Sequence, residues 1–215
     1  MSDKSVFTIG HSTHELDYFI SLLQQFGVNC IIDVRSTPYS RMAPQYNQPG
    51  LKASLKQHSI VYMHLEKEFG ARHTNPALLD EAGKVDFDKV RATDTFKQGL
   101  QRLKNGLDLG YQVALMCSEA DPLDCHRFSM ISYQLVKEGL SVKHILGDSQ
   151  LVENSQLEDW LLQKYQKKLP AQSSFFETVT RESRLETAYR LRGQAVAYSP
   201  AAASAEEEED SGLAI

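Results

Sequence analysis

Chemically reactive side chains gather in one short stretch of the chain, and they are Cys117, Glu119, Cys125, His126 and Arg127. The apolar run that ends at Cys117 predicts a buried strand, a turn rich in Pro and Asp follows it, and a helical pattern begins near Cys125. A buried strand presents its last side chains at the edge of the sheet where the strand ends. The first turn of a helix adds unpaired N–H groups and a partial positive charge. We therefore expect the chemistry of this protein here.

A reactive thiol is the first interpretation of this stretch. In the first turn of a helix, beside the imidazole of His126 and the guanidinium of Arg127, Cys125 is expected to have a lowered pKa. Cys117 or Cys125 would then act as a nucleophile or redox thiol. The unreactive alternative is that Cys125 is only a small buried helix residue.

A metal site is the second interpretation. Thiolate, imidazole and carboxylate groups are zinc ligands, so Cys117, Cys125 and His126, with Glu119 or His11 as a fourth group, could hold zinc and activate a water. Two features oppose it. The Cys-x7-Cys-His spacing is not that of a zinc knuckle, and adjacent residues on a helix point in different directions.

An anion pocket is the third interpretation, compatible with either of the others. Arginines at strand or helix ends, together with a helix N-terminus, bind phosphate or carboxylate groups. The expected substrate-binding residues are Arg35, Arg41, Arg127, Ser12 and Ser36. Glu119 and His11 are the acid/base candidates in such a site.

The elements that position these residues form an alternating pattern of strands and helices. Five apolar runs predict strands, at residues 6–10, 30–35, 60–65, 112–117 and 141–146. Helical stripes lie between most of them. This order predicts an α/β fold with a Rossmann-like, doubly wound, mainly parallel five-stranded sheet. Ligands of such sheets bind beyond the carboxyl ends of the strands, where His11, Arg35, Glu66, Cys117 and Glu119 should converge.

Local signals set the expected boundaries. Ser12 and Glu15 have the spacing of a capping box before a helix, and a second helix is expected from about Asp124 to Lys137. Residues 1–150 are expected to form the Rossmann-like domain, and residues 151–198 a helical C-terminal extension that includes a helix from Phe176 to Leu191. Residues 199–215 have the composition of a disordered acidic tail.

Composition excludes several classes of protein. The net charge of −5 is explained by the acidic run Glu206–Asp210, since the rest of the chain carries 23 basic and 28 − 5 = 23 acidic residues. A strongly basic duplex-binding surface is therefore not expected. No apolar stretch is long enough to span a bilayer. The three cysteines do not suggest a disulfide framework, so we expect a cytoplasmic protein without a membrane partner.

Three sequence motifs resemble a known family. They are Thr8-Ile9-Gly10-His11-Ser12, the stretch from Asp33-Val34-Arg35-Ser36 to Arg41, and Cys117-x-Glu119-x-Asp121-Pro122-x-x-Cys125-His126-Arg127. Together they resemble the bacterial domain of unknown function 488 (DUF488), over roughly residues 6–146. The later Ala188-Tyr189-Arg190-x-Arg192-Gly193 is similar to that family's ending. The resemblance implies this fold and this site, and it implies no particular reaction.

The sequence supports one leading hypothesis and two alternatives, three in all. The first, leading hypothesis is an enzyme, a transferase or hydrolase, that acts on a small phosphate-bearing molecule or a nucleic-acid end through the Cys/His/Arg/Glu site. The second is a non-catalytic module that binds a nucleotide or a partner through the same cleft, and the third is a zinc-dependent hydrolase. The substrate, the reaction and the oligomeric state stay open.

Overall fold

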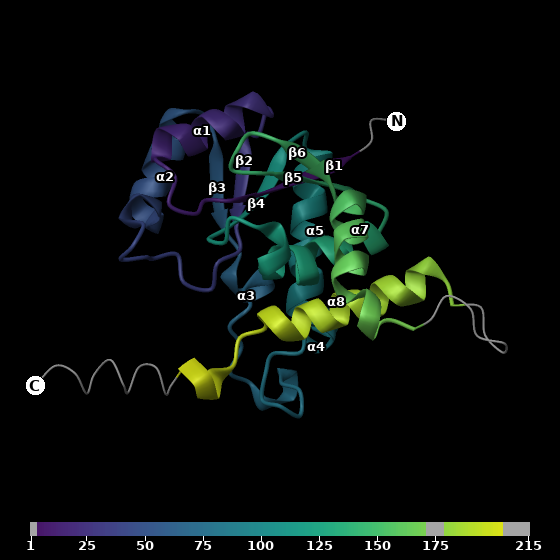
Figure 1. The fold of residues 1–215 in the computed structure, drawn as a ribbon. Helices are drawn as coiled ribbons and strands as arrows, with labels where there is room; N and C mark the ends of the chain where they lie inside the picture. The colour runs from purple at the N-terminus through teal and green to yellow at the C-terminus, as the bar shows by residue number, and fades with distance from the viewer. Residues whose placement is uncertain (1–3, 171–178, 204–215) are drawn as a thin grey trace, which may run out of the picture.

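The structure, a computed structural model, describes residues 4–170 and 179–203 as an α/β fold built on one six-stranded sheet (Figure 1). The strands are β1 (Ser5–Gly10), β2 (Cys30–Asp33), β3 (Val61–His64), β4 (Val113–Cys117), β5 (Ser141–Ile145) and β6 (Leu151–Glu153). The α-helices are α1 (Leu16–Gln25), α2 (Gln48–Gln57), α3 (Glu66–Phe69), α4 (Phe87–Ala92), α5 (Asp94–Asp108), α6 (Tyr133–Lys137), α7 (Asn154–Tyr165) and α8 (Arg181–Val196). Shorter 3₁₀ segments are Pro44–Tyr46, Pro76–Leu78, Pro122–Asp124 and Gln166–Lys168, and Arg127–Ser132 is π-helical.

The sheet order is β3-β2-β4-β1-β5-β6. The first five strands are parallel, as predicted, and β6 pairs antiparallel with β5. The sequence predicted five strands, and β6 is a sixth strand that it did not predict. The sequence placed its three residues at the start of the helical extension, because a strand so short carries no clear alternation.

The two faces of the sheet bury two separate apolar clusters. Successive residues of β4 show this plainly, since Val113 and Leu115 lie in one cluster and Ala114 and Met116 in the other. The first cluster includes residues of α5 and α6, and the second includes residues of α1 and α2. Strand side chains alternate between faces, and both faces are covered by helices, so the central strand β4 is apolar throughout.

The C-terminal helices α7 and α8 pack on one another and on the segment that follows β4. Leu157 and Leu161 of α7 share a third apolar cluster with Tyr189 of α8 and Phe128. In Figure 1, α8 crosses the lower part of the molecule close to α4. The predicted second helix of the extension therefore exists, displaced to Arg181–Val196, and its expected start at Phe176 lies outside the described residues. So does the acidic run 206–210.

No helix in the described part of the chain is long and apolar enough to cross a membrane.

Candidate functional site

Three neighbouring strands bring the site together at their carboxyl ends. Gly10 at the end of β1 lies beside Cys117 at the end of β4, and Asp33 at the end of β2 lies beside Met116. Because these strands are parallel, the residues that follow them emerge at the same edge of the sheet. Of the five residues expected to converge here, Arg35, Cys117 and Glu119 line one cleft, whereas His11 and Glu66 lie outside its lining.

The loop after β4 is fixed against the loop after β1. The backbone N–H of His11 donates to Cys117 O, and that of Ser12 donates to Ser118 O, both at 2.9 Å. Gly10 makes this approach possible, since a Cβ at this position would lie 1.8 Å from Glu119 O. The capping box predicted from Ser12 was wrong: Glu15 is the N-cap of α1, and Ser12 has a φ of 49° in the turn before it.

Two buried arginines donate hydrogen bonds to the loop that follows β4. Arg127, 1% exposed, donates from Nη1 to Glu119 O at 2.7 Å and from Nη2 to Ala120 O at 3.1 Å. Arg192 of α8 donates from Nε to Leu123 O at 2.6 Å and also pairs with the carboxylate of Asp124. The loop between the two cysteines is thus bound to the protein body at both of its ends.

Cys125 lies before the helix and not inside it, contrary to the prediction of a helix from about Asp124. Its backbone is extended, with φ −128° and ψ 146°, whereas His126 is in the helical region. The helix then starts as a π-helical turn at Arg127, a form that is frequent at functional sites. This break lets two adjacent side chains face the same point, which a regular helix would prevent.

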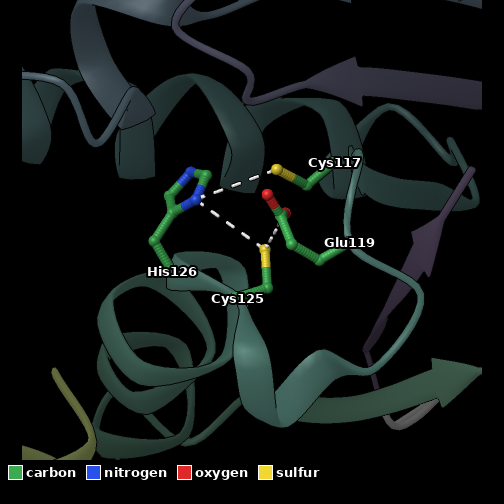
Figure 2. Close-up of side chains that lie close together, drawn as sticks. All are labelled: Cys117, Glu119, Cys125 and His126. Atoms are coloured by element: carbon green, nitrogen blue, oxygen red, sulfur yellow. Dashed lines mark hydrogen bonds between the residues drawn. The ribbon is translucent and has the colours of Figure 1, made fainter. Parts of the chain in front are cut away.

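The side chains of Cys117, Glu119, Cys125 and His126 point toward one another (Figure 2). His126 Nδ1 lies 3.8 Å from the sulfur of Cys117 and 3.7 Å from that of Cys125. Cys125 Sγ lies 2.9 Å from Glu119 Oε2. On the other side of the ring, His126 Nε2 lies 3.2 Å from Val34 O. The Nε2–H therefore donates to this carbonyl, and Nδ1 faces the two sulfurs.

The two cysteines have opposite electrostatic environments. Burial raises the pKa of Cys125, but the Cys117 thiol, Arg127 and His126 outweigh it and hold this pKa well below its ordinary value. The hydrogen bond to Cys125, together with burial, raises the pKa of Cys117 well above its ordinary value. Burial and the charge of Cys125 raise the pKa of Glu119. Burial lowers the pKa of His126, but Cys125 and Glu119 outweigh it and raise this pKa.

The same four groups fit a metal ion. One ligand atom from each of Cys117, Glu119, Cys125 and His126 lies within 4.8 Å of all the others. Ligand atoms around a tetrahedral zinc, with Zn–S of about 2.3 Å and Zn–N of about 2.0 Å, are roughly 3.5 Å apart. The sulfur–nitrogen distances here are close to that. The bond from Nε2 to a carbonyl is also the support that metal-binding histidines usually have.

His11 is not part of this cluster, although the sequence offered it as a fourth ligand. Its Nδ1 lies 2.7 Å from Ser12 O and its Nε2 lies 3.1 Å from Arg35 Nη1, so both nitrogens are occupied. The ring stacks on Tyr46 with centres 4.1 Å apart. Burial lowers its pKa to about 4. The neutral His11 ring therefore helps to position the guanidinium of Arg35 through the contact at Nε2.

Arg35 is itself neutralised. It forms a buried ion pair with Asp33, with Nη2 2.6 Å from Oδ2 and Nε 2.9 Å from Oδ1. Tyr62 Oη donates to the same carboxylate at 2.6 Å. The guanidinium of Arg35 also lines a cleft beside the cluster, but its positive charge is balanced by the carboxylate of Asp33.

The remaining predicted residues lie at the edges of the site. Ser36 Oγ accepts hydrogen bonds from the backbone N–H groups of Ala71 and Arg72, each at 3.0 Å. Arg41 is exposed and lies outside the set of residues that line the cleft. Cys30 is buried in the core, where burial raises its pKa to about 11, and it takes no part in the cluster.

A cleft of about 460 Å³ opens above the cluster. Its floor includes Cys117, Cys125 and His126, with Glu119 on its wall, and the other lining residues are Arg35, Ser36, Thr37, Tyr39, Ser40, Ala71, Arg72, Ser118, Asp124, Val196 and Tyr198. This volume is in the range of small-molecule binding sites.

Sequence reasoning missed the contributions of Arg72, Tyr198 and Arg192 to the site. Arg72 lies in a polar segment after β3. This segment has no hydrophobic periodicity, so the sequence gives no reason to select Arg72 over its neighbours. The motif around Arg192 and the nearby Tyr198 was visible in the sequence, but nothing in it indicated that this segment returns to the loop before Cys125.

The fold and site define an α/β protein with a Cys/Glu/Cys/His cluster at the carboxyl edge of a mainly parallel sheet. The family model described as "Domain of unknown function DUF488" matches residues 15–134, which is more than half of the chain, and the protein belongs to this family. The match includes the motifs from Asp33 and from Cys117, whereas the first motif and the C-terminal one lie outside it. We found no match to the chain among curated proteins or among solved structures.

Proposed function

We propose that this protein is a zinc-dependent hydrolase that acts on a phosphate-bearing substrate in the cleft above Cys117. The observation that carries the proposal is the approach of four ligand atoms, from Cys117, Glu119, Cys125 and His126, to within 4.8 Å of one another at the floor of a cleft. Two sulfurs and an imidazole form a donor set typical of zinc.

The residues would divide the work as follows. Cys117, Cys125 and His126 would hold the ion, which would supply a Lewis acid able to activate a water near neutral pH. Glu119 is close enough to be a fourth ligand, but it also lines the cleft beside Cys125. There its carboxylate would leave one position of the ion open and act as general base toward a water, then as general acid toward the leaving group. The hydrogen bonds from Arg127 to the carbonyls of Glu119 and Ala120 would hold the loop so that Glu119 stays beside Cys125.

The substrate class rests on the size and the cations of the cleft. A volume of about 460 Å³ suits a nucleotide or the end of a nucleic-acid strand, and two arginines, Arg35 and Arg72, line it. Arginine recognises phosphate groups with paired N–H donors.

A test is to assay the purified protein against a panel of phosphate mono- and diesters, before and after treatment with a chelator. The proposal predicts turnover that the chelator abolishes and zinc restores, and that falls at least about 100-fold in Glu119→Gln, as expected for loss of a general base. Saturable binding without turnover of any ester would instead indicate a non-catalytic binding module.

A reactive thiol is the second candidate, and one observation favours it. The sulfur of Cys125 lies on the cleft floor, contacts His126 Nδ1 and Glu119 Oε2, and accepts the backbone N–H of Arg127 at 3.4 Å. These contacts are those of an activated nucleophile. This candidate predicts activity that survives the chelator and is abolished when iodoacetamide alkylates Cys125.

A further inference from the structure

An arginine and a tyrosine from distant parts of the chain meet at the wall of the cleft. Arg72 follows α3, and Tyr198 follows α8, yet the guanidinium carbon of Arg72 lies 5.5 Å from the centre of the Tyr198 ring. Both residues line the cleft whose floor is the Cys/Glu/Cys/His cluster. The chain therefore returns to the site near its C-terminal end.

Hydrogen bonds fix the backbone of both residues. The N–H of Arg72 donates to Ser36 Oγ at 3.0 Å, and Tyr198 O accepts from the N–H of Val85 at 2.9 Å. Ser36 itself follows β2, close to the ion pair of Arg35. The Arg72–Tyr198 contact is thus attached to the rigid sheet edge on one side and to the segment before α4 on the other.

The charge of Arg72 differs from that of the other arginines near the site. Arg35 is neutralised by Asp33, and Arg127 is buried against backbone carbonyls. Within residues 4–170 and 179–203, no carboxylate forms an ion pair with Arg72, whose side chain is exposed. An arginine that stacks on an aromatic ring keeps its in-plane N–H groups available for an anion.

The cleft also offers aromatic surface. Tyr39 is 64% exposed and lines the same cleft as Tyr198. Exposed tyrosines in a cleft stack on planar rings such as nucleobases, and they do so with little preference for one base.

We propose that Arg72 and Tyr198 form a subsite that binds the phosphate of a nucleotide-sized substrate, whose planar ring contacts the tyrosines of the cleft. This inference rests on the proposed function for the position of the reacting bond, over the Cys/Glu/Cys/His cluster. It replaces Arg41 and Arg127, the anion-binding arginines expected from the sequence, with an arginine that faces the cleft and is free of a carboxylate partner in the described chain.

The test is a calorimetric titration of the full-length protein, as purified, with adenosine 5′-monophosphate, adenosine and inorganic phosphate. The inference predicts saturable binding of the monophosphate with one site per chain, and weaker binding of adenosine and of phosphate alone. In Arg72→Ala the affinity for the monophosphate should fall at least about tenfold, the usual effect of losing a charge-assisted bond. Tyr198→Ala should weaken it and Tyr198→Phe should retain it.

The matched control is Arg41→Ala, which removes an exposed arginine outside the cleft lining and should leave the affinity unchanged. Equal affinities for Arg72→Ala and Arg41→Ala, or no saturable binding by the wild type, would overturn the inference. Metal content is measured on the same samples. Arg72-dependent binding by a metal-free protein would refute only the zinc hydrolase, and an intact metal without an Arg72 effect would refute only the subsite.

Discussion

Arg127 shows how burial changes the role of a residue. A guanidinium beside Cys125 and His126 reads in sequence as part of an anion clamp, but here it is 1% exposed and its two Nη groups donate to the carbonyls of Glu119 and Ala120. An arginine in such a position stabilises a loop, because each buried carbonyl that loses its donor costs free energy.

We therefore expect Arg127→Met to lower the free energy of unfolding by about 2–4 kcal/mol, since two carbonyls lose a charged donor. Urea denaturation measures this value. Arg41→Met, at an exposed position, serves as the control and should change it by less than about 0.5 kcal/mol. If the Arg127 variant were as stable as the wild type and only lost phosphate binding, Arg127 would be a ligand-binding residue after all.

Residue types and spacing were enough to select Cys117, Glu119, Cys125 and His126 as candidates, because thiols, a carboxylate and an imidazole at a strand end are informative in themselves. Their mutual geometry was not predictable. It depends on the extended backbone of Cys125, and a helical pattern read from sequence does not reveal such a break. The same limit applies to His11, whose burial against Arg35 and Tyr46 depends on the fold.

The site depends on how closely the loops after β1 and β4 approach each other. The strand–helix alternation predicted that these loops share an edge, whereas the strand order was not predictable, since sequence carries little information about which strands pair. The small β6 was missed for a related reason. Its three residues gain their extended form from pairing with β5 and not from a local pattern.

Gly10 provides a test of this close approach. A Cβ in Gly10→Ala would collide with Glu119 O, so the loop that carries Glu119 must move. We expect a lower melting temperature and zinc affinity reduced at least about tenfold, measured by competition with a chromophoric chelator. Gly50→Ala is the control, since a Cβ there meets no atom within 4 Å. Unchanged zinc affinity in Gly10→Ala would show that the loop position does not matter to the cluster.

Two buried neutral histidines link the stability of the whole fold to pH. Burial lowers the pKa of His11 to about 4 and that of His144 to about 3. His144 lies between Thr8 Oγ1, at 2.8 Å, and Asn154 Oδ1, at 3.1 Å, and so joins the sheet to α7. Both histidines gain a proton more readily when the chain is unfolded, so their contribution is complete above pH 6.5 and is lost as the pH falls toward 4.

We expect each of these histidines to lower the free energy of unfolding by about 2 kcal/mol between pH 7 and pH 5. In His144→Gln this pH dependence should therefore be shallower by about that amount, whatever the stability of the variant at pH 7. His58→Gln, at the exposed residue that follows α2, is the control and should keep the wild-type slope. Parallel stability curves for His144→Gln and the wild type would contradict the buried neutral histidine.

If Cys117 and Cys125 belong to one zinc site, as we propose, the metal content of the protein will depend on both thiols. The protein, grown with added zinc, is measured by native mass spectrometry and elemental analysis beside Cys117→Ser, Cys125→Ser and the control Cys30→Ser, whose thiol lies in the core outside the cluster. We expect one zinc per chain in the wild type and in Cys30→Ser, and none in the other two variants. A metal-free wild type, or zinc retained by both site variants, would contradict it.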